Sequence, residues 1–265
     1  MMRKMTDIHV HSSFSHDGKS TISDYAALLR VNSGIEAIGL AEHVDFMPEC
    51  GGYGTFDNCG YLSEAIKKQY RDVMIIPGAE IDYSTTVENE IKTALRQNDY
   101  AYVIASVHIV NKIPFSTDEN KSRFTYSDEF RHILEEYYHQ VGSCLNMKET
   151  DCVGHIGIYK RYMEKSLLDE MDLTEYISMK ENSLAKACAE SGKIIEVNTS
   201  GYKSAAKAPF PDYDFMRKFY SYGGRKAALG SDAHKTDDVC FMFAEAAARL
   251  REIGFKDLVK PWENR

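Results

Sequence analysis

Asp7-Ile8-His9-Val10-His11 lies near the start of the chain and has the pattern of a short β-strand. Side chains alternate between the two faces of a strand, so His9 and His11 point one way and the aliphatic residues point the other way. Two imidazoles on one face can reach a single metal ion. The stretch therefore predicts a strand that ends in a metal-binding pair, and Asp17 in the following loop is a further candidate ligand.

Six more apolar runs are each expected to form a strand that is followed by a helix. The predicted strands cover 6–11, 36–41, 73–77, 100–105, 152–155, 193–198 and 226–229. Apolar residues at helical spacing predict helices over about 21–34, 59–70, 86–97, 127–146, 173–191, 212–222 and 237–253. Alternating strands and helices require parallel strands with right-handed crossovers. The pattern therefore indicates an α/β fold.

The positions of the polar residues distinguish between two α/β architectures. Seven strand–helix units fit a distorted (β/α)7 barrel, similar to the TIM barrel, and an open doubly wound sheet is the alternative. Histidines and carboxylates fall where the strands end, as a site at the C-terminal mouth of a barrel requires. No linker or break in composition divides the sequence. We therefore predict one barrel domain over 1–265 with a metal site at its C-terminal mouth.

Composition excludes several classes of function. The net charge of −8 argues against a nucleic-acid partner, which would need a basic face. No apolar run approaches the roughly 20 residues of a membrane helix, so no membrane partner is expected. The six cysteines form no Cys-x-x-Cys pair, which indicates free thiols in a reducing compartment and predicts a cytoplasmic protein. Nothing in the pattern assigns an oligomeric state.

Nine candidate metal ligands lie at the strand ends or in the first loop. They are His9, His11, Asp17, His43, Glu80, His108, His155, Asp232 and His234. Imidazole and carboxylate ligands suit Zn, Fe or Mn. Nine ligands are too many for one ion, so we expect two to three divalent metal ions bridged by a carboxylate.

Each candidate has a plainer interpretation when it is taken singly. Glu80 and Asp232 would each suit the cap of a following helix. The same plain reading is kept for three histidines away from the strand ends, which are His16, His132 and His139. Glu42 alternates with His43 and is expected to pack or to orient a ligand. The joint pattern at every strand end favours the metal site.

The ordered motifs resemble those of the PHP (polymerase and histidinol phosphatase) family. They are Asp7-x-His9-x-His11, Asp17-Gly18, Glu42-His43, Gly78-Ala79-Glu80, Ser106-Val107-His108, Gly154-His155, Glu196-x-Asn198 and Gly230-Ser231-Asp232-Ala233-His234. The resemblance spans residues 7 to 234 and implies a distorted (β/α)7 barrel that holds up to three metal ions.

The resemblance also implies how the ligands are shared among the ions. The first set is His9, His11, Glu80 and Asp232, the second is Glu80, His108 and His155, and the third is Asp17, His43 and His234. Glu80 would bridge the first two. The third set departs from family members that have histidine where Asp17 stands.

Within the family the chain most resembles the stand-alone members that hydrolyse L-histidinol phosphate in histidine biosynthesis. Chain length, the long loops 44–60 and 110–127, and Gly154-His155-Ile-Gly-Ile-Tyr-Lys160-Arg161-Tyr carry this likeness. The expected reaction is attack of a metal-activated hydroxide on phosphorus of a small phosphomonoester. Alternatives are a nucleotide, short nucleic acid or phosphotyrosine substrate, a metal-dependent hydrolase of C–N bonds, and an inactive metal-binding module.

Roles follow for several residues outside the ligand sets. Arg161 is the candidate phosphate-binding cation, and its plainer interpretation is a solvated surface arginine. Asp232 or a metal-bound water is expected to protonate the leaving alcohol, and Glu80 and His234 are the other candidate catalytic groups. The residues expected to contact the ammonium and ring of the substrate are Asp45, Phe46 and Tyr53. Asn198 is expected to hydrogen-bond near the metals, and Glu196 to be structural.

Overall fold

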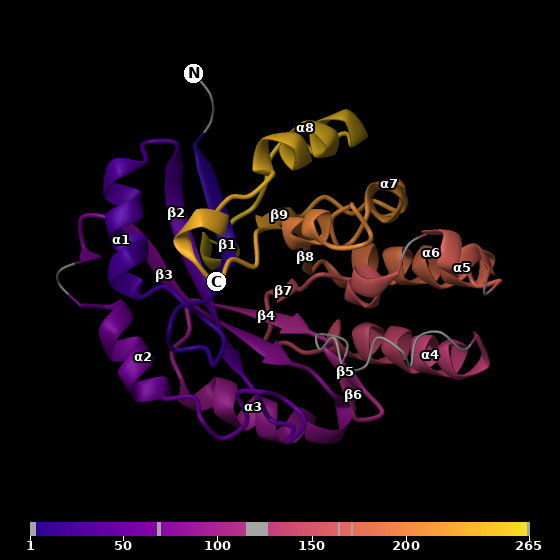
Figure 1. Cartoon of the computed structure of the whole chain (residues 1–265), viewed down its shortest axis with the longest axis horizontal. Helices are drawn as coiled ribbons and strands as arrows, with labels where there is room; N and C mark the ends of the chain where they lie inside the picture. The colour runs from indigo at the N-terminus through magenta and orange to yellow at the C-terminus, as the bar shows by residue number, and fades with distance from the viewer. Residues whose placement is uncertain (1–3, 68–69, 115–126, 164, 171, 264–265) are drawn as a thin grey trace.

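The computed structural model describes residues 4–67, 70–114, 127–163, 165–170 and 172–263, without the side chains of 127–129 and 165–167. Seven parallel strands form one sheet in the order β1-β2-β3-β4-β7-β8-β9. They are β1 (Met5–Val10), β2 (Ile35–Val44), β3 (Met74–Asp82), β4 (Tyr102–Ser106), β7 (Cys152–Val153), β8 (Ile194–Asn198) and β9 (Ala227–Gly230). The predicted parallel α/β architecture is confirmed, and Figure 1 shows the sheet in the middle of the molecule.

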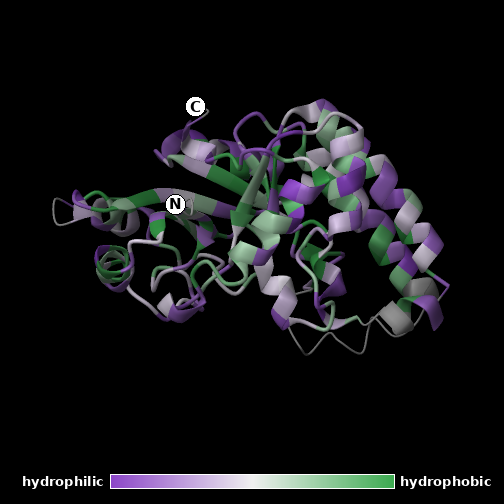
Figure 2. Ribbon diagram, turned by 90° about the horizontal axis from the view of Figure 1, so that it is seen from above, coloured by the Kyte–Doolittle hydropathy of each residue, from purple (hydrophilic) through white to green (hydrophobic). Residues whose placement is uncertain are grey.

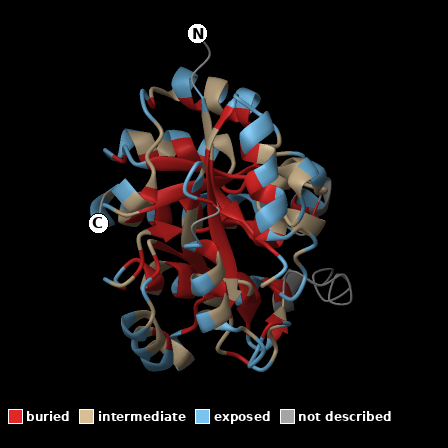
Figure 3. Cartoon of the chain, turned by 90° about the vertical axis from the view of Figure 1, so that its left-hand side faces the viewer, coloured by how far each residue is buried: buried red, intermediate tan, exposed pale blue. Residues whose placement is uncertain are grey.

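Eight α-helices in the described part of the chain surround this sheet. They are α1 (Ile22–Val31), α2 (Asn58–Ala65), α3 (Glu88–Gln97), α4 (Ser127–Cys144), α5 (Lys165–Glu170), α6 (Thr174–Ser191), α7 (Tyr213–Ser221) and α8 (Phe243–Ile253). Apolar residues gather on the central strands in Figure 2, and the same strands are the buried part in Figure 3. None of the helices described is both long and apolar enough to cross a membrane.

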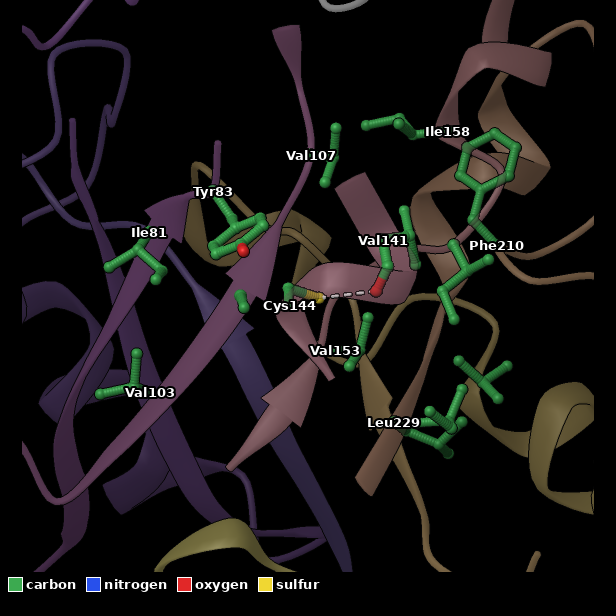
Figure 4. Packing of buried hydrophobic residues seen from close by; sticks show 14 of the residues in the cluster. Ile81, Tyr83, Val103, Val107, Val141, Cys144, Val153, Ile158, Phe210 and Leu229 are labelled. Carbon is green, nitrogen blue, oxygen red and sulfur yellow. Dashed lines mark hydrogen bonds between the residues drawn. The ribbon is translucent and has the colours of Figure 1, made fainter. Parts of the chain in front are cut away.

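Two apolar layers flank the barrel wall. Between the sheet and the helices, Val141 and Cys144 of α4 lie close to Val153 of β7 in Figure 4. Inside the barrel, a smaller cluster is built around Tyr102, whose hydroxyl donates to the Ile8 carbonyl at 2.6 Å. This bond lies where the pairing of β1 with β2 is irregular. The inner cluster fills the barrel interior with apolar side chains.

The barrel is closed between β1 and β9 by only a few backbone bonds and one carboxylate. Val10 and Ala233 form an isolated parallel bridge, and the Ala233 carbonyl accepts from the His11 amide at 2.8 Å. The fully buried carboxylate of Asp7 accepts from the backbone amides of Ser231 at 3.0 Å and Cys240 at 2.8 Å. Asp7 therefore fastens the last strand to the first and fixes the turn that carries Asp232.

Local signals behave as expected in several places. Thr21 and Asp24 form a capping box at the start of α1. Gly192 ends α6 with a φ of 69°, in the left-handed region that glycine adopts without strain. The start of α1 and the end of α6 are therefore determined by side-chain and backbone chemistry visible in the sequence.

Other boundaries were wrong. The last helix begins at Phe243 and not near 237, because Cys240 and Met242 have φ values of 57° and 56° and the Cys240 amide is committed to Asp7. The loop 110–127 holds the end of a two-stranded antiparallel hairpin, β5 (Ile109–Val110) with β6 (Ile113–Pro114), and 115–126 lies outside the described residues.

Asp7 predicts a pH dependence of stability. Burial raises its pKa from 3.8 to about 6, although hydrogen bonds from Ser231, Cys240 and His9 oppose the rise. The folded state thus binds the proton more tightly than the unfolded chain, so this carboxyl's contribution to the free energy of unfolding falls by about 3 kcal/mol as pH rises from about 4 to about 6.

Asp7→Asn lacks this titration. We therefore expect the stability advantage of the wild type over Asp7→Asn to shrink as pH rises through this window. Urea unfolding of both proteins in chelator, at a series of pH values, measures the difference. An advantage that stays constant or grows would contradict the argument.

Candidate metal centre

The carboxylate of Glu80 lies at the centre of the barrel mouth and is 1% exposed. Its Oε1 faces the end of β4 and the loop after β7, where His155 Nε2 lies at 2.8 Å and His108 Nε2 at 3.4 Å. Its Oε2 faces β1 and β2. The distances from Oε2 are 3.2 Å to His9 Nε2, 3.2 Å to His43 Nδ1 and 3.6 Å to His11 Nε2. One carboxylate thus contacts two separate groups of imidazoles.

Two aspartates extend this cluster towards the mouth. Asp232 Oδ1 lies 3.3 Å from His11 Nε2. Asp17 Oδ2 lies 3.0 Å from His234 Nε2, and its Oδ1 lies 3.8 Å from His43 Nε2. All nine residues singled out in the sequence as candidate ligands are therefore brought together.

Ligand atoms close enough to share an ion form three groups among the described residues. They are His9, His11 and Asp232; His9, Glu80 and His155; and His11, His43 and His234. This grouping overlaps the sets that the resemblance implies but cuts across them, because His9 and His11 each belong to two groups. Both histidines stand at the boundary between neighbouring ion positions.

Buried polar atoms without a hydrogen-bond partner show that the residues fit a cation. Among the described residues, His9 Nε2, His11 Nε2 and Glu80 Oε2 are buried and unpartnered, as is His155 Nδ1. Leaving such atoms unsatisfied costs about 1–3 kcal/mol each. The first three converge on one point, where a divalent ion would satisfy all of them.

A second layer of groups orients the imidazoles, and sequence reasoning found only part of it. Glu196 accepts a hydrogen bond from His9 Nδ1 at 2.7 Å. Glu196 was expected to be structural only, but it also orients a candidate metal ligand. Ser15 Oγ lies 3.3 Å from His11 Nδ1 and donates to Glu42. Glu42 was expected to orient a ligand, and it does so through Ser15. The inward alternation of Glu196 with Asn198 on β8 was the available signal for the missed role.

Electrostatics keep the central carboxylate ionised. Burial alone would raise the pKa of Glu80, but the charges of His9 and His108 and the hydrogen bonds from His108 and His155 hold it well below its usual range. Burial lowers the pKa of His108, yet Glu80 and Asp82 raise it to about 9. In the absence of metal, Glu80 is therefore an anion beside a charged His108.

A cavity of about 910 Å³ opens above this cluster. Its basic side chains are Lys19, Arg161 and Lys203, from the loops after β1, β7 and β8. The end of β3 and the loop after β2 contribute carboxylates, which are Asp45, Glu49 and Asp82. The volume is within the range of about 300–1,000 Å³ usual for small-molecule sites.

Buried charge anchors the segment that carries Arg161 to the cavity. The side chain of the neighbouring Lys160 is only 15% exposed, and its Nζ lies 2.6 Å from Glu181 on α6 and 2.8 Å from Asp212 before α7. The Arg161 carbonyl accepts from the Ala205 amide at 3.1 Å. Arg161 is thus held at the cavity wall, whereas its plainer interpretation placed it among solvated surface residues.

Asn198 hydrogen-bonds Glu196 and Ser200 beside the candidate ligands, as expected, and it is fully buried outside the cavity lining. Two other side chains differ from their expected surroundings. Phe46 packs against the core and does not line the cavity within the described residues. His16, expected to be structural, lines the mouth with its ring centroid 5.4 Å from that of His43.

Comparisons with known proteins agree with this geometry. The PHP domain family profile matches residues 7–200. A Clostridium acetobutylicum protein named probable histidinol-phosphatase is 27% identical over 94% of both chains. Bacillus subtilis histidinol-phosphatase is 25% identical over 89% of this chain and 96% of its own.

A solved structure shares the fold. Histidinol phosphate phosphatase from Lactococcus lactis, complexed with Zn, L-histidinol and phosphate, has a TM-score of 0.78 and 24% identity, covering 96% of this chain and 95% of that chain. Together with the family match, which covers most of the chain, the ordered strand-end residues lead to one conclusion. The chain belongs to the PHP family.

Proposed function

We propose that this protein is a metal-dependent phosphomonoesterase that hydrolyses L-histidinol phosphate to L-histidinol and phosphate. The observation that carries the proposal is the Glu80 carboxylate, which lies among five imidazoles beneath a cavity with basic and acidic walls. The names of the relatives from C. acetobutylicum and B. subtilis support the choice of substrate.

The nine clustered residues are assigned as ligands of two to three divalent ions. The proposed sets are those that the resemblance implies, with Glu80 shared between the first two. Zn is the first candidate, because the L. lactis neighbour was solved with Zn, and the ligand types also suit Fe and Mn. When bound, the ions would supply an activated water and would stabilise charge on the phosphoryl oxygens.

The basic wall of the cavity is assigned to the phosphate. Arg161 can donate two parallel hydrogen bonds to phosphoryl oxygens. Lys203 lies 2.6 Å from Asp238, which also lines the cavity and keeps the ammonium at the wall. Lys19 is exposed at the mouth. These cations would hold the nonbridging oxygens, where most of the charge lies during phosphoryl transfer.

The acidic wall is assigned to the ammonium group of the substrate. One oxygen of Asp45 accepts from the Gly52 amide at 3.0 Å. Burial raises the pKa of Asp45 above its usual range, so the carboxylate gains from a cationic partner. Because Phe46 packs away from the cavity, Asp45 is the stronger candidate of the pair for substrate binding.

Where two ions fill the first two sets and the third set is empty, proton transfer to the leaving alcohol is assigned to His234. Burial would raise the pKa of Asp232, but His11, His9 and His234 hold it well below its usual range, which suits an acceptor or ligand. Burial lowers the pKa of His234, yet Asp17 and Asp232 raise it to about 9. His234 would therefore hold a proton at neutral pH whenever no ion occupies the third set.

The proposed function is tested by a substrate panel with metal analysis. We expect two to three ions per chain and a kcat/KM for L-histidinol phosphate that exceeds the values for a nucleotide monophosphate and phosphotyrosine by orders of magnitude. Chelation should abolish activity and Zn, Fe or Mn should restore it. Equal, weak rates on all three would reject the substrate, and a preference for either alternative would identify it instead.

Arg161 should act on phosphate binding. We expect Arg161→Met to lower kcat/KM for every phosphomonoester and to weaken inhibition by inorganic phosphate by about 10-fold to 100-fold, because a hydrogen bond to a charged group contributes about 1.5–3 kcal/mol. Arg225→Met is the matched control, since Arg225 packs over the Tyr220 ring outside the cavity lining. Unchanged inhibition by phosphate would remove Arg161 from the site.

Asp45 should act on the cationic end of the substrate. We expect Asp45→Asn to raise KM for L-histidinol phosphate by about 10-fold to 100-fold, on the same scale of charged hydrogen bonds. The KM for glycerol phosphate, which has no ammonium group, should stay within a factor of about two. Parallel steady-state kinetics on both substrates provide the measurement, and an equal change for both would contradict the assignment.

A further inference from the structure

Glu196 lies at the base of the candidate metal centre and is fully buried. Its Oε1 is 2.7 Å from His9 Nδ1 and 3.2 Å from the Asn198 amide nitrogen, which donates to it. Its Oε2 accepts from the backbone amide of His155 at 2.8 Å. We propose that Glu196 is a positioning residue that holds one ligand of each of the first two metal sets, and the inference rests on the ligand assignment made above.

The contact of Glu196 with His9 determines which ring nitrogen of His9 carries no proton and can bind a metal ion. Metal binding requires a neutral His9, and because a carboxylate can only accept hydrogen bonds, the remaining proton of the ring must then be on Nδ1. The opposite nitrogen, Nε2, is then unprotonated and lies 3.2 Å from Glu80 Oε2. Glu196 therefore prepares His9 as a metal ligand, as outer carboxylates do for many ligating histidines.

The contact with His155 acts on the backbone. The His155 ring reaches Glu80 Oε1 at 2.8 Å from a loop that follows a strand of two residues. So short a strand holds the start of this loop with few ladder bonds. The hydrogen bond from the His155 amide to Glu196 therefore helps to hold the backbone of the ligand residue in place.

Two glycines leave the space that this carboxylate occupies. A Cβ at Gly230 would lie 1.9 Å from Glu196 Oε1. A Cβ at Gly154 would lie 2.2 Å from Ser106 Oγ and 3.4 Å from Glu196 Oε2. The strand ends of β9 and β7 thus make room for a buried charge that contacts ligands on both sides.

His11 is held differently and provides a comparison. Its Nδ1 lies 3.3 Å from Ser15 Oγ, a neutral group that donates to Glu42. Among the described residues, the Ser15 hydroxyl bonds no member of the second set of ligands. Loss of Glu196 should therefore affect two sets, and loss of the Ser15 hydroxyl only one of them.

Two substitutions separate the effects. Glu196→Gln keeps the shape but replaces one acceptor by an NH2 donor. If the new NH2 group faces His9 Nδ1, that nitrogen must accept, so the ring proton moves to Nε2 and blocks the metal-binding atom. If the NH2 group instead faces the backbone amide of His155, two hydrogen-bond donors point at each other. Glu196→Ala removes both contacts at once.

The measurement is metal retention by the folded holoprotein during titration with a chelator, with far-UV circular dichroism to verify the fold. We expect Glu196→Gln to raise the Kd of at least one ion by about 10-fold to 100-fold. Glu196→Ala should release two ions together, and Ser15→Ala should release one from the first two sets. Asp151→Asn is the control, because Asp151 accepts from the Val103 amide outside the centre and should retain every ion.

Retention at the wild-type level in folded Glu196→Gln would overturn the proposal. Release of a single ion by Glu196→Ala would overturn the link between the two sets. If Glu196→Ala does not fold, the isosteric Glu196→Gln decides. A wild-type protein that binds no divalent ion would instead overturn the ligand assignment, so the two failures are distinguishable.

Discussion

A single ionised carboxylate in the interior of the barrel determines the arrangement of the residues around it. Removing a charge of this size from water costs several kcal/mol, even after the protein relaxes. Glu80 is 1% exposed, and the barrel beneath it is filled by the apolar cluster around Tyr102. The groups that offset this desolvation cost must therefore lie beside and above Glu80, where five imidazoles and the cavity are found.

The same constraint explains why acidic groups recur behind the imidazoles. An imidazole that faces Glu80 or a metal ion with one nitrogen still has a second nitrogen in the protein interior. Glu196 satisfies that nitrogen for His9, and Ser15 does so for His11 with Glu42 behind it. Carboxylates thus lie on both sides of these imidazoles, and each ligand atom is oriented by its neighbour.

Most of this architecture could be predicted from the sequence, because the end of a strand is recognised from neighbouring residues alone. Apolar runs followed by histidine or carboxylate predict both the strands and the ligands, since parallel strands end at one edge of a sheet or one mouth of a barrel. Glu42 and His43 lie within β2, and Glu80 lies within β3, rather than after the strands. That Glu42 and His43 point to different faces was nevertheless predicted from their alternation along the strand.

Contacts between distant strands could not be predicted in the same way. Glu196 meets His9 only because β8 and β1 lie on either side of β9 once the barrel closes, and their relative height depends on the whole closed sheet. The positions of Lys19 and Lys203 in the cavity lining depend on loop paths, which no periodicity specifies. Asp7 was recognised as part of a motif, but its bonds to Ser231 and Cys240 join the two ends of the sequence.

Strand order also explains how the cavity separates Asp45 and Asp82 from Arg161 and Lys203. The carboxylates of Asp45 and Asp82 follow β2 or end β3, whereas Arg161 and Lys203 follow β7 and β8, about half-way round the ring. In an open sheet these positions would lie along one line. Closure between β1 and β9 brings them to opposite sides of the metal centre. On the proposed assignments, a small molecule with a phosphate at one end and a cation at the other would place its phosphoryl group on the side of Arg161.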